Sequence, residues 1–261
     1  MSGIHSTAIV DPGAQLGEGV TIGPFSVIGP KVVLGDRVQL KSHVVVTGTT
    51  EIGEDTSILP FSVIGEIPQD LKYDGEETRL VVGARNRIRE HVTMNTGTSG
   101  GGGITRVGDD GLFMAGCHVA HDVQIGNRVI LANSVAVAGH AIVEDDVILG
   151  GLAGVHQFVR IGQGAIIGGI TRVVRDVIPY GMVQTTSGEL EGLNLIGLKR
   201  RGLSRADIGE IRAAYQALGQ EEGTFQDRAR KLAEANKNDL VRNIIDFITT
   251  ESDRSYLVPK G

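Results

Sequence analysis

Aliphatic residues stand at every sixth position over most of this 261-residue chain. The series runs without a break from Ile4 to Ile64, resumes from Val82 to Met94, and continues from Val107 to Val173. A period of six differs from the 3.6-residue period of an amphipathic helix, and a single alternating strand does not produce it. The repeat therefore indicates a solenoid built of hexapeptides.

We expect an all-β fold, a left-handed parallel β-helix shaped as a triangular prism. Each hexapeptide supplies a short strand and a corner, and its aliphatic side chain points into the prism. Three hexapeptides close one coil of 18 residues, so residues 18 apart stack along the axis and backbone hydrogen bonds run between coils. Tryptophan is absent and aromatic residues make up only 4% of the chain, which favours a core of stacked aliphatic side chains.

Two segments interrupt the hexads, and the C-terminal part lacks them. Residues 66–80 and 100–106 are expected to leave the prism as loops, because an insertion in a solenoid is extruded at a corner. From residue 188 onward the apolar spacing becomes helical, with Ser204 and Thr224 in N-cap positions. We expect two domains, a β-helix over 1–187 and a helical domain over 188–261 that covers the open edge of the prism.

Composition limits the partners and the compartment. The net charge of −6 argues against nucleic acid as the main partner. The single cysteine, Cys117, excludes an intrachain disulfide and is typical of a reducing compartment. No run of about 18 apolar residues is present and the first residues lack signal-peptide features, so we expect a cytoplasmic protein without stable membrane insertion.

Stacking at 18 residues brings distant polar residues together. His121, Gly139 and Gln157 fall in one column of the expected lattice. Three further histidines lie beside this column: His118, His140 and His156. A single histidine at a corner more often bonds a carbonyl group than takes part in catalysis, but four around one edge predict a functional site.

The column at His121 holds the groups that acyl transfer to a hydroxyl needs. Asp122 follows His121 and is placed to orient the imidazole or to stabilise its protonated form. Gly139, one coil on, offers a backbone N–H with no side chain in the way, as an oxyanion donor requires. We predict that His121 takes the proton, the oxygen attacks the acyl carbon, and the Gly139 N–H binds the oxyanion. Cys117 occupies the small-residue position of its hexad and is expected inside the prism, not as a nucleophile.

Two groups of cations have open roles. Residues 199–201, Lys-Arg-Arg, suit a diphosphate beside a helix, but a solvated charge run explains them equally well. Arg85, Arg87 and Arg89 alternate along one predicted strand, where they either bind an acidic carrier protein or only solvate the surface.

The lattice and five motifs resemble the family of UDP-N-acetylglucosamine acyltransferases of lipid A biosynthesis. The motifs are QDLKY at 69–73, HVAHD at 118–122, AGH at 138–140, GGLAGVHQF at 150–158 and GLKRRG at 197–202. The resemblance implies a cytosolic homotrimer with active sites between neighbouring prisms. It also implies transfer of a 3-hydroxyacyl chain from acyl carrier protein to the 3-position of UDP-N-acetylglucosamine, the first step of lipid A biosynthesis, without a cofactor or metal.

The same resemblance assigns roles to individual residues. His121 matches the family's general base, with Asp122 beside it, and Gly139 matches its oxyanion glycine. Gly169 matches a position that limits acyl length, where a glycine leaves room for a longer chain. The remaining matches are substrate contacts, of which the last three lie near the nucleotide: Asp70, Lys72, His118, His140, His156, Gln157, Asn194, Arg200 and Arg201.

Three positions depart from the familiar pattern of the family. Ile196 stands where a glutamate contacts the nucleotide, Ser187 where a histidine helps bound the acyl pocket, and Asn95 where a histidine is usual. These changes leave acyl length and nucleotide affinity open. The sequence also leaves open whether the sugar's 3-position carries a hydroxyl or an amine, because one base serves both nucleophiles.

Three other functions are compatible with a hexapeptide prism. A γ-type carbonic anhydrase uses the same prism with three zinc-binding histidines, but it explains neither residues 199–201 nor the helical domain. A non-enzymatic scaffold has no use for a polar column centred on His121. The related N-acyltransferase of the same pathway carries a uridine-binding domain before its prism, whereas hexads here begin at Ile4.

Overall fold

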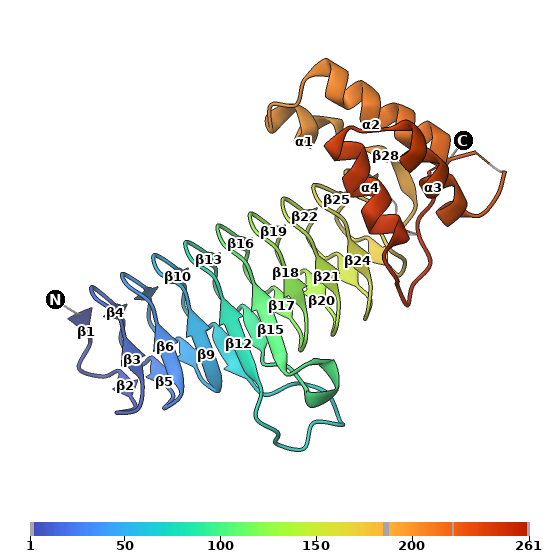
Figure 1. Ribbon diagram of the computed structural model, residues 1–261. Coiled ribbons are helices and arrows are strands. Elements are labelled where there is room, and N and C mark those ends of the chain that lie inside the picture. The colour runs from blue at the N-terminus through green and yellow to red at the C-terminus, as the bar shows by residue number, and fades with distance from the viewer. Residues whose placement is uncertain (1–2, 185–187, 221, 260–261) are drawn as a thin grey trace.

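The chain winds as a left-handed parallel β-helix, with four helices at its C-terminal end (Figure 1). The computed structural model describes residues 3–184, 188–220 and 222–259. Within these residues the strands form three sheets, which we call A, B and C.

Sheet A contains β1 (Gly3–Ile4), β4 (Thr21–Ile22), β7 (Gln39–Leu40), β10 (Ser57–Ile58), β13 (Arg87–Ile88), β16 (Leu112–Phe113), β19 (Ile130–Leu131), β22 (Ile148–Leu149), β25 (Ile166–Ile167), β27 (Gly181–Val183) and β28 (Leu190–Leu193). Sheet B contains β2 (Ile9–Val10), β5 (Val27–Ile28), β8 (Val45–Val46), β11 (Val63–Glu66), β14 (Thr93–Asn95), β17 (His118–Val119), β20 (Ala136–Val137), β23 (Gly154–Val155) and β26 (Arg172–Val173). Sheet C contains β3 (Gln15–Leu16), β6 (Val32–Leu34), β9 (Thr49–Ile52), β12 (Arg79–Val82), β15 (Ile104–Val107), β18 (Gln124–Ile125), β21 (Ile142–Val143) and β24 (Arg160–Ile161).

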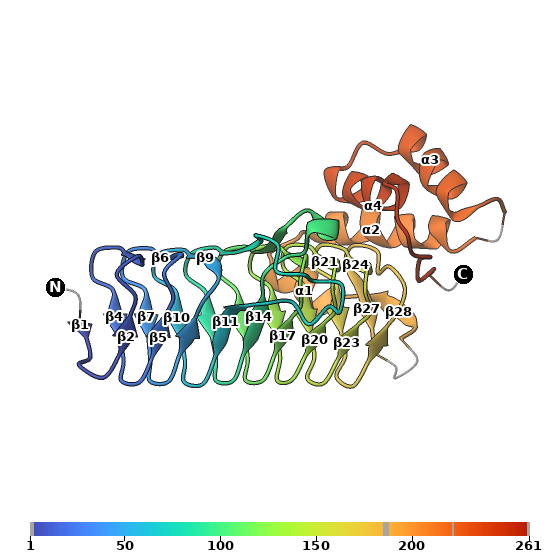
Figure 2. The ribbon, with the colours of Figure 1, turned by 90° about the horizontal axis from the view of Figure 1, so that it is seen from below.

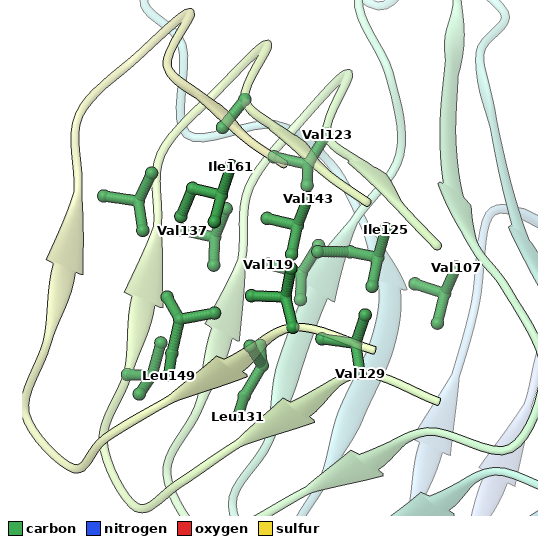
Figure 3. Packing of buried hydrophobic residues seen from close by; sticks show 14 of the residues in the cluster. Val107, Val119, Val123, Ile125, Val129, Leu131, Val137, Val143, Leu149 and Ile161 are labelled. Carbon is green, nitrogen blue, oxygen red and sulfur yellow. The ribbon is translucent and has the colours of Figure 1, made fainter. Parts of the chain in front are cut away.

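The strand register confirms the 18-residue coil. Val119 pairs with Val137, and Val137 pairs in turn with Val155, always in parallel. The three valines are buried, and Figure 3 shows Val119 and Val137 among the aliphatic side chains that fill the prism. Cys117 is fully buried as expected, and burial raises the pKa of its thiol to about 11. Ile4 is 43% exposed, because the first coil has no coil beneath it.

The corners of the prism use left-handed backbone conformations at residues other than glycine. Asp122 has a φ of 59° and His140 a φ of 62°. Such a conformation costs free energy for a residue with a Cβ. At both corners a hydrogen bond between coils compensates: His140 N–H donates to the His121 carbonyl at 3.1 Å, and Asp122 N–H donates to the Thr105 hydroxyl at 2.8 Å.

A ladder of alternating charges follows the corner between sheets C and A. From the N-terminal end its residues are Arg37, Asp55, Arg85, Asp110, Arg128 and Asp146. Arg37 Nη2 lies 2.7 Å from Asp55 Oδ2, and Arg128 Nε lies 2.7 Å from Asp146 Oδ1. We call this feature the charge ladder.

The charge ladder corrects one expectation about the arginines at 85–89. Arg85 turns a corner and pairs with Asp110 at 2.8 Å, so it does not alternate along a strand with the other two. Arg89 pairs with the adjacent Glu90 at 3.1 Å, and only Arg87 lies in β13. The corner between two hexapeptides separates these side chains, which a strand of five residues would have kept on one face.

Another corner, between sheets A and B, carries apolar and aromatic side chains. The rings of Phe25, His43, Phe61 and His91 stack in succession, with centroids 5.0 to 5.2 Å apart. Further along the same corner lie Leu152 and Ile170, both largely exposed. We call this exposed row the A–B ridge.

Both interruptions of the hexads leave the corner between sheets B and C and lie over the middle coils (Figure 2). The first excursion spans 67–78, between β11 and β12. The second spans 96–103 and includes the 3-10 turn η1 (Ser99–Gly101). Residues 104–106, expected in this loop, instead belong to β15, where Ile104 pairs with Arg79 of β12.

The C-terminal part contains α1 (Leu195–Arg200), α2 (Arg205–Leu218), α3 (Phe225–Ala235) and α4 (Asp239–Thr249). Ser204 and Thr224 cap α2 and α3 in complete capping boxes, as the sequence predicted. The region expected to be helical from 188 begins instead with β28, which pairs antiparallel with β27 and places Leu190 in the core. None of the helices in the described residues is long and apolar enough to cross a bilayer.

One buried arginine joins the last complete coil to the helices. Arg160 Nε pairs with Asp176 at 2.8 Å, and its Nη2 donates to the Phe247 carbonyl at 3.0 Å and to the Tyr256 hydroxyl at 2.9 Å. Its guanidinium also lies 4.5 Å from the centroid of the Phe247 ring. These contacts place α4 and the C-terminal segment on the prism.

Replacing Arg160 with methionine should therefore lower the free energy of unfolding by about 3–5 kcal/mol, because Asp176 is left buried without its cation. Arg37→Met, which removes an exposed rung of the charge ladder, should cost less than about 1 kcal/mol. Urea unfolding at one protein concentration measures both variants. Equal losses would show that Arg160 does not anchor the helices.

Candidate functional site

The corner between sheets B and C, which we call the B–C edge, carries the predicted column. The chain turns this edge at His121 after β17, at Gly139 after β20, and at Gln157 after β23. Consecutive turns are joined by backbone bonds, such as that from Phe158 N–H to the Gly139 carbonyl at 3.2 Å. The three residues therefore occupy adjacent coils, as predicted from the sequence.

His121 and Asp122 form a buried pair. His121 Nδ1 lies 2.8 Å from Asp122 Oδ2, and their side chains are only 9% and 0% exposed. A neutral imidazole that donates from Nδ1 to the carboxylate keeps its lone pair on Nε2. This geometry leaves Nε2 as the atom that can accept a proton.

Gly139 lies directly against the His121 ring. A Cβ placed on Gly139 would lie 2.5 Å from His121 Cε1 and 2.6 Å from Nε2, so a side chain there would displace the ring. Gly139 is buried, and its backbone N–H has no hydrogen-bond acceptor within the described part of the chain. The imidazole of His121 and the backbone of Gly139, whose N–H has no acceptor within the described residues, therefore lie in direct contact.

The second excursion closes over Asp122, which the sequence did not predict. Thr98 donates its N–H to Asp122 Oδ1 at 2.9 Å and its hydroxyl to Oδ2 at 2.6 Å. A Cβ on Gly97 or Gly101 would clash with the same carboxylate. The sequence predicted only a loop over 100–106 here, and its glycine run was the one available sign of close packing.

His140 and His118 flank the pair. The His140 ring stacks on Phe158 with centroids 4.5 Å apart and meets the His121 ring edge-on at 5.0 Å. Burial lowers the pKa of His140, although the nearby Asp122 opposes this shift. His118 Nδ1 bonds the Thr93 hydroxyl at 2.8 Å, and burial together with His121 lowers its pKa. Both shifts favour neutral imidazoles at pH 7.

His156 and Gln157 contact the C-terminal segment. Arg254 Nη2 lies 2.9 Å from His156 Nδ1, and Arg254 Nε donates to the Gln157 carbonyl at 3.1 Å. The Gln157 residue is exposed on the B–C edge. Sequence spacing could not identify Arg254, because it lies outside the hexad lattice.

The first excursion reaches this edge with Asp70 and Lys72. Asp70 Oδ1 accepts from Lys72 N–H at 3.0 Å, and the charges of the two residues act on the pKa of His140 in opposite directions. At the base of the excursion, Asn95 Nδ2 donates to the Ile67 carbonyl at 3.0 Å. The departure from the family pattern at Asn95 therefore lies where the excursion starts.

The residues matched to the nucleotide lie on another side of the prism. Asn194, Arg200 and Arg201 line a cavity of about 580 Å³ between α1 and the outer face of sheet A. Its floor is aliphatic and includes Ile130, Ile148, Ile166 and Met182. Ile196, the second departure, is 66% exposed and also lines the cavity. Ser187 lies outside the described residues.

Two of these residues also hold α1 in place. Asn194 accepts from Gly197 N–H at 2.9 Å and donates to the Gly164 carbonyl at 3.0 Å. Arg201 Nη1 lies 3.4 Å from Asp146, and its guanidinium fills the space that a side chain at Gly164 would need. Arg201, at the end of α1, thus adds one more cation to the charge ladder beside Asp146.

Within one chain, the predicted residues lie in three places. His121, Asp122 and Gly139 meet at the B–C edge, near His118, His140 and the first excursion. Gly169 precedes Ile170 on the A–B ridge, and the nucleotide-matched residues cover sheet A. One chain alone therefore does not assemble the complete predicted site.

His121, Asp122 and His140 are also the one group in the described residues with the spacing of a metal site. One potential ligand atom from each lies within 4.8 Å of the others. Both oxygens of Asp122 already accept bonds from Thr98, and Oδ2 also meets His121 Nδ1. This arrangement favours a hydrogen-bonded dyad over a cation site.

Known proteins resemble the chain in both parts. A family model for bacterial transferase hexapeptides matches residues 13–48, and one described as UDP N-acetylglucosamine O-acyltransferase, domain 2, matches 176–257. The acyl-[acyl-carrier-protein]–UDP-N-acetylglucosamine O-acyltransferase of Paracoccus denitrificans is 65% identical over 75% of this chain and 74% of its own. The enzyme of that name from Agrobacterium fabrum is 49% identical over 98% and 95%.

A solved structure is also similar to this chain in fold. A crystal structure of a UDP-N-acetylglucosamine acyltransferase superposes with a TM-score of 0.95 at 42% identity and covers 99% of both chains. Its similarity therefore extends over the prism and the helices together.

Replacing Gly139 with alanine should push the His121 ring away and break its 2.8 Å contact with Asp122, because the new Cβ overlaps the ring. Gly154→Ala, in a neighbouring strand where a Cβ meets nothing within 4 Å, should leave the ring in place. Crystal structures of the two variants check this. An unmoved imidazole in Gly139→Ala would contradict the close approach.

Proposed function

This chain belongs to the UDP-N-acetylglucosamine O-acyltransferases, and we propose that it transfers a 3-hydroxyacyl chain from acyl carrier protein to the 3-position of UDP-N-acetylglucosamine or its 3-amino analogue. This transfer is the first step of lipid A biosynthesis. The observation that carries the proposal is the contact between His121 and Gly139 at the B–C edge.

In the proposed reaction, His121 Nε2 accepts the proton of the sugar's 3-hydroxyl as its oxygen attacks the thioester carbonyl. The carbonyl oxygen becomes an oxyanion, which the free N–H of Gly139 stabilises. When the intermediate collapses, the C–S bond breaks and the protonated His121 returns its proton to the leaving thiolate. Asp122 holds the imidazole in the required tautomer and stabilises its charged form.

The acyl group needs no covalent attachment to the protein in this reaction. Cys117 is buried in the prism, and burial raises the pKa of its thiol, so it is a poor nucleophile. The substrate contacts proposed around His121 are those at the same edge: Asp70, Lys72, His118, His140, His156 and Gln157.

We infer that the active protein is a homotrimer with sites shared between neighbours. Asn194, Arg200 and Arg201 lie on sheet A and not at the B–C edge, so a neighbouring subunit would supply them to a site at His121. The A–B ridge exposes apolar side chains, including Leu152 and Ile170, which a neighbour would cover. A soluble carrier protein and a nucleotide sugar are consistent with a cytoplasmic location.

Zinc-dependent chemistry is the second candidate, because His121, Asp122 and His140 have the spacing of a metal site, although the hydrogen bonds that Asp122 already accepts favour acyl transfer. Metal analysis of the purified protein distinguishes the two. Stoichiometric zinc that activity requires would overturn the acyl-transfer mechanism.

His121→Ala should lower kcat by at least about a hundredfold, because general-base catalysis is lost. His5→Ala, at the exposed N-terminal end, should leave turnover unchanged. Product formation with acyl carrier protein and UDP-N-acetylglucosamine measures both, with sedimentation and thermal unfolding as checks on assembly and folding. Near-normal turnover by a folded His121→Ala protein would refute the mechanism.

Gly169→Met should shift the preference toward shorter acyl chains, because a long side chain would project from an exposed position that now carries none, with only its Cβ held 3.1 Å from the Gly151 carbonyl oxygen. Gly209→Met, at an exposed position of α2 with open space around it, should not. Each variant is given acyl carrier proteins with acyl chains of different lengths, with either UDP-N-acetylglucosamine or its 3-amino analogue as acceptor. Mass spectrometry of the products then identifies the acyl chain that is transferred and the acceptor that is used. An unchanged chain-length profile would exclude Gly169 as a determinant.

A further inference from the structure

The carboxylate of Asp122 has a second fixed neighbour besides His121. Thr98 donates to both of its oxygens, through the N–H to Oδ1 and the hydroxyl to Oδ2. We propose that Thr98 is a positioning residue for the proposed acyl transfer, acting on His121 through Asp122. The proposal rests on the function inferred above.

The hydrogen bonds leave the carboxylate one orientation. Oδ2 accepts from the Thr98 hydroxyl at 2.6 Å and faces His121 Nδ1 at 2.8 Å, while Oδ1 accepts from Thr98 N–H at 2.9 Å. The backbone N–H of Asp122 donates to the Thr105 hydroxyl at 2.8 Å, which fixes the main chain at the same corner. Rotating the carboxylate would break bonds to Thr98 and turn Oδ2 away from His121.

The excursion that carries Thr98 also excludes water from the pair. Thr98 is 6% exposed and the Asp122 side chain is fully buried. Gly97 and Gly101 allow this closeness, since a Cβ at either would overlap the carboxylate. Charge-assisted hydrogen bonds are strongest where water is excluded.

Internal bonds hold this cover in shape and connect it to the first excursion. Gly103 N–H donates to the Thr98 carbonyl at 2.8 Å. Ser99 donates its N–H and its hydroxyl to Glu76 Oε1, at 3.1 and 3.2 Å. The Ser99 N–H, together with the backbone N–H groups of Asp74 and Glu76, lowers the pKa of Glu76 to about 2. Thr98 therefore lies in a braced segment and not in a flexible spacer.

The buried hydroxyl bonds Asp122 and not the expected substrate side of His121, so its loss should affect turnover more than substrate binding. Thr98→Val keeps the side-chain shape but removes the donor, and kcat should fall roughly ten- to a hundredfold while KM changes little. Thr98→Ser keeps the hydroxyl and should retain kcat within about threefold of the unmodified protein.

Thr96→Val is the matched control. Thr96 is equally buried and lies two residues away, but its hydroxyl bonds Thr78 at 3.1 Å and not Asp122. It should therefore lose stability but keep kcat. An unchanged kcat in folded Thr98→Val, an equal loss in Thr96→Val, or a failure of Thr98→Ser to retain activity would each overturn the proposal.

A spectroscopic measurement separates this proposal from the proposed function. In the unmodified protein the Nδ1 proton of His121, bonded to Asp122, should give a downfield proton resonance, which Thr98→Val should shift or broaden and Thr96→Val should not. Absence of acyltransferase turnover in the unmodified protein would refute the function alone. An unaltered His121 resonance in Thr98→Val would refute the role of Thr98.

Discussion

Hydrogen bonding between consecutive coils governs the rest of this structure. Each strand is short, so no single pairing is stable alone, and the parallel bonds accumulate only because every coil repeats the same length. The same repeat brings the proposed catalytic residues together, since His121 and Gly139 meet because they are 18 residues apart. Even the left-handed corner residues depend on it, because their N–H groups donate to the preceding coil.

Features governed by this repeat could be predicted from the sequence. The three sheets, the inward aliphatics, the helix caps at Ser204 and Thr224, and the approach of Gly139 to His121 all follow from periodicity or from local capping chemistry. Interactions made by segments outside the lattice could not be predicted in this way. Thr98 lies in an excursion without a period, and β28 continues sheet A after the hexads have ended.

The spacing of residues in the sequence also could not predict contacts between the prism and the C-terminal part of the chain. Arg254 reaches His156 from the C-terminal segment, and Arg160 joins the prism to α4. The sequence left Arg201 either as an anion contact or as part of a solvated charge run, yet it also pairs with Asp146 and fills the place above Gly164. The residues proposed to lie near the nucleotide are therefore part of the junction between the prism and α1.

The charge ladder has a consequence for how the chain finds its correct winding. Inside the prism one aliphatic coil resembles the next, so a slip by a whole coil would change the core little. At the corner between sheets C and A such a slip would place Arg37 opposite Arg85 in place of Asp55. Like charges would then face each other along this corner, and their repulsion would raise the free energy of the shifted register. The alternation of charges therefore favours the correct pairing of coils during folding.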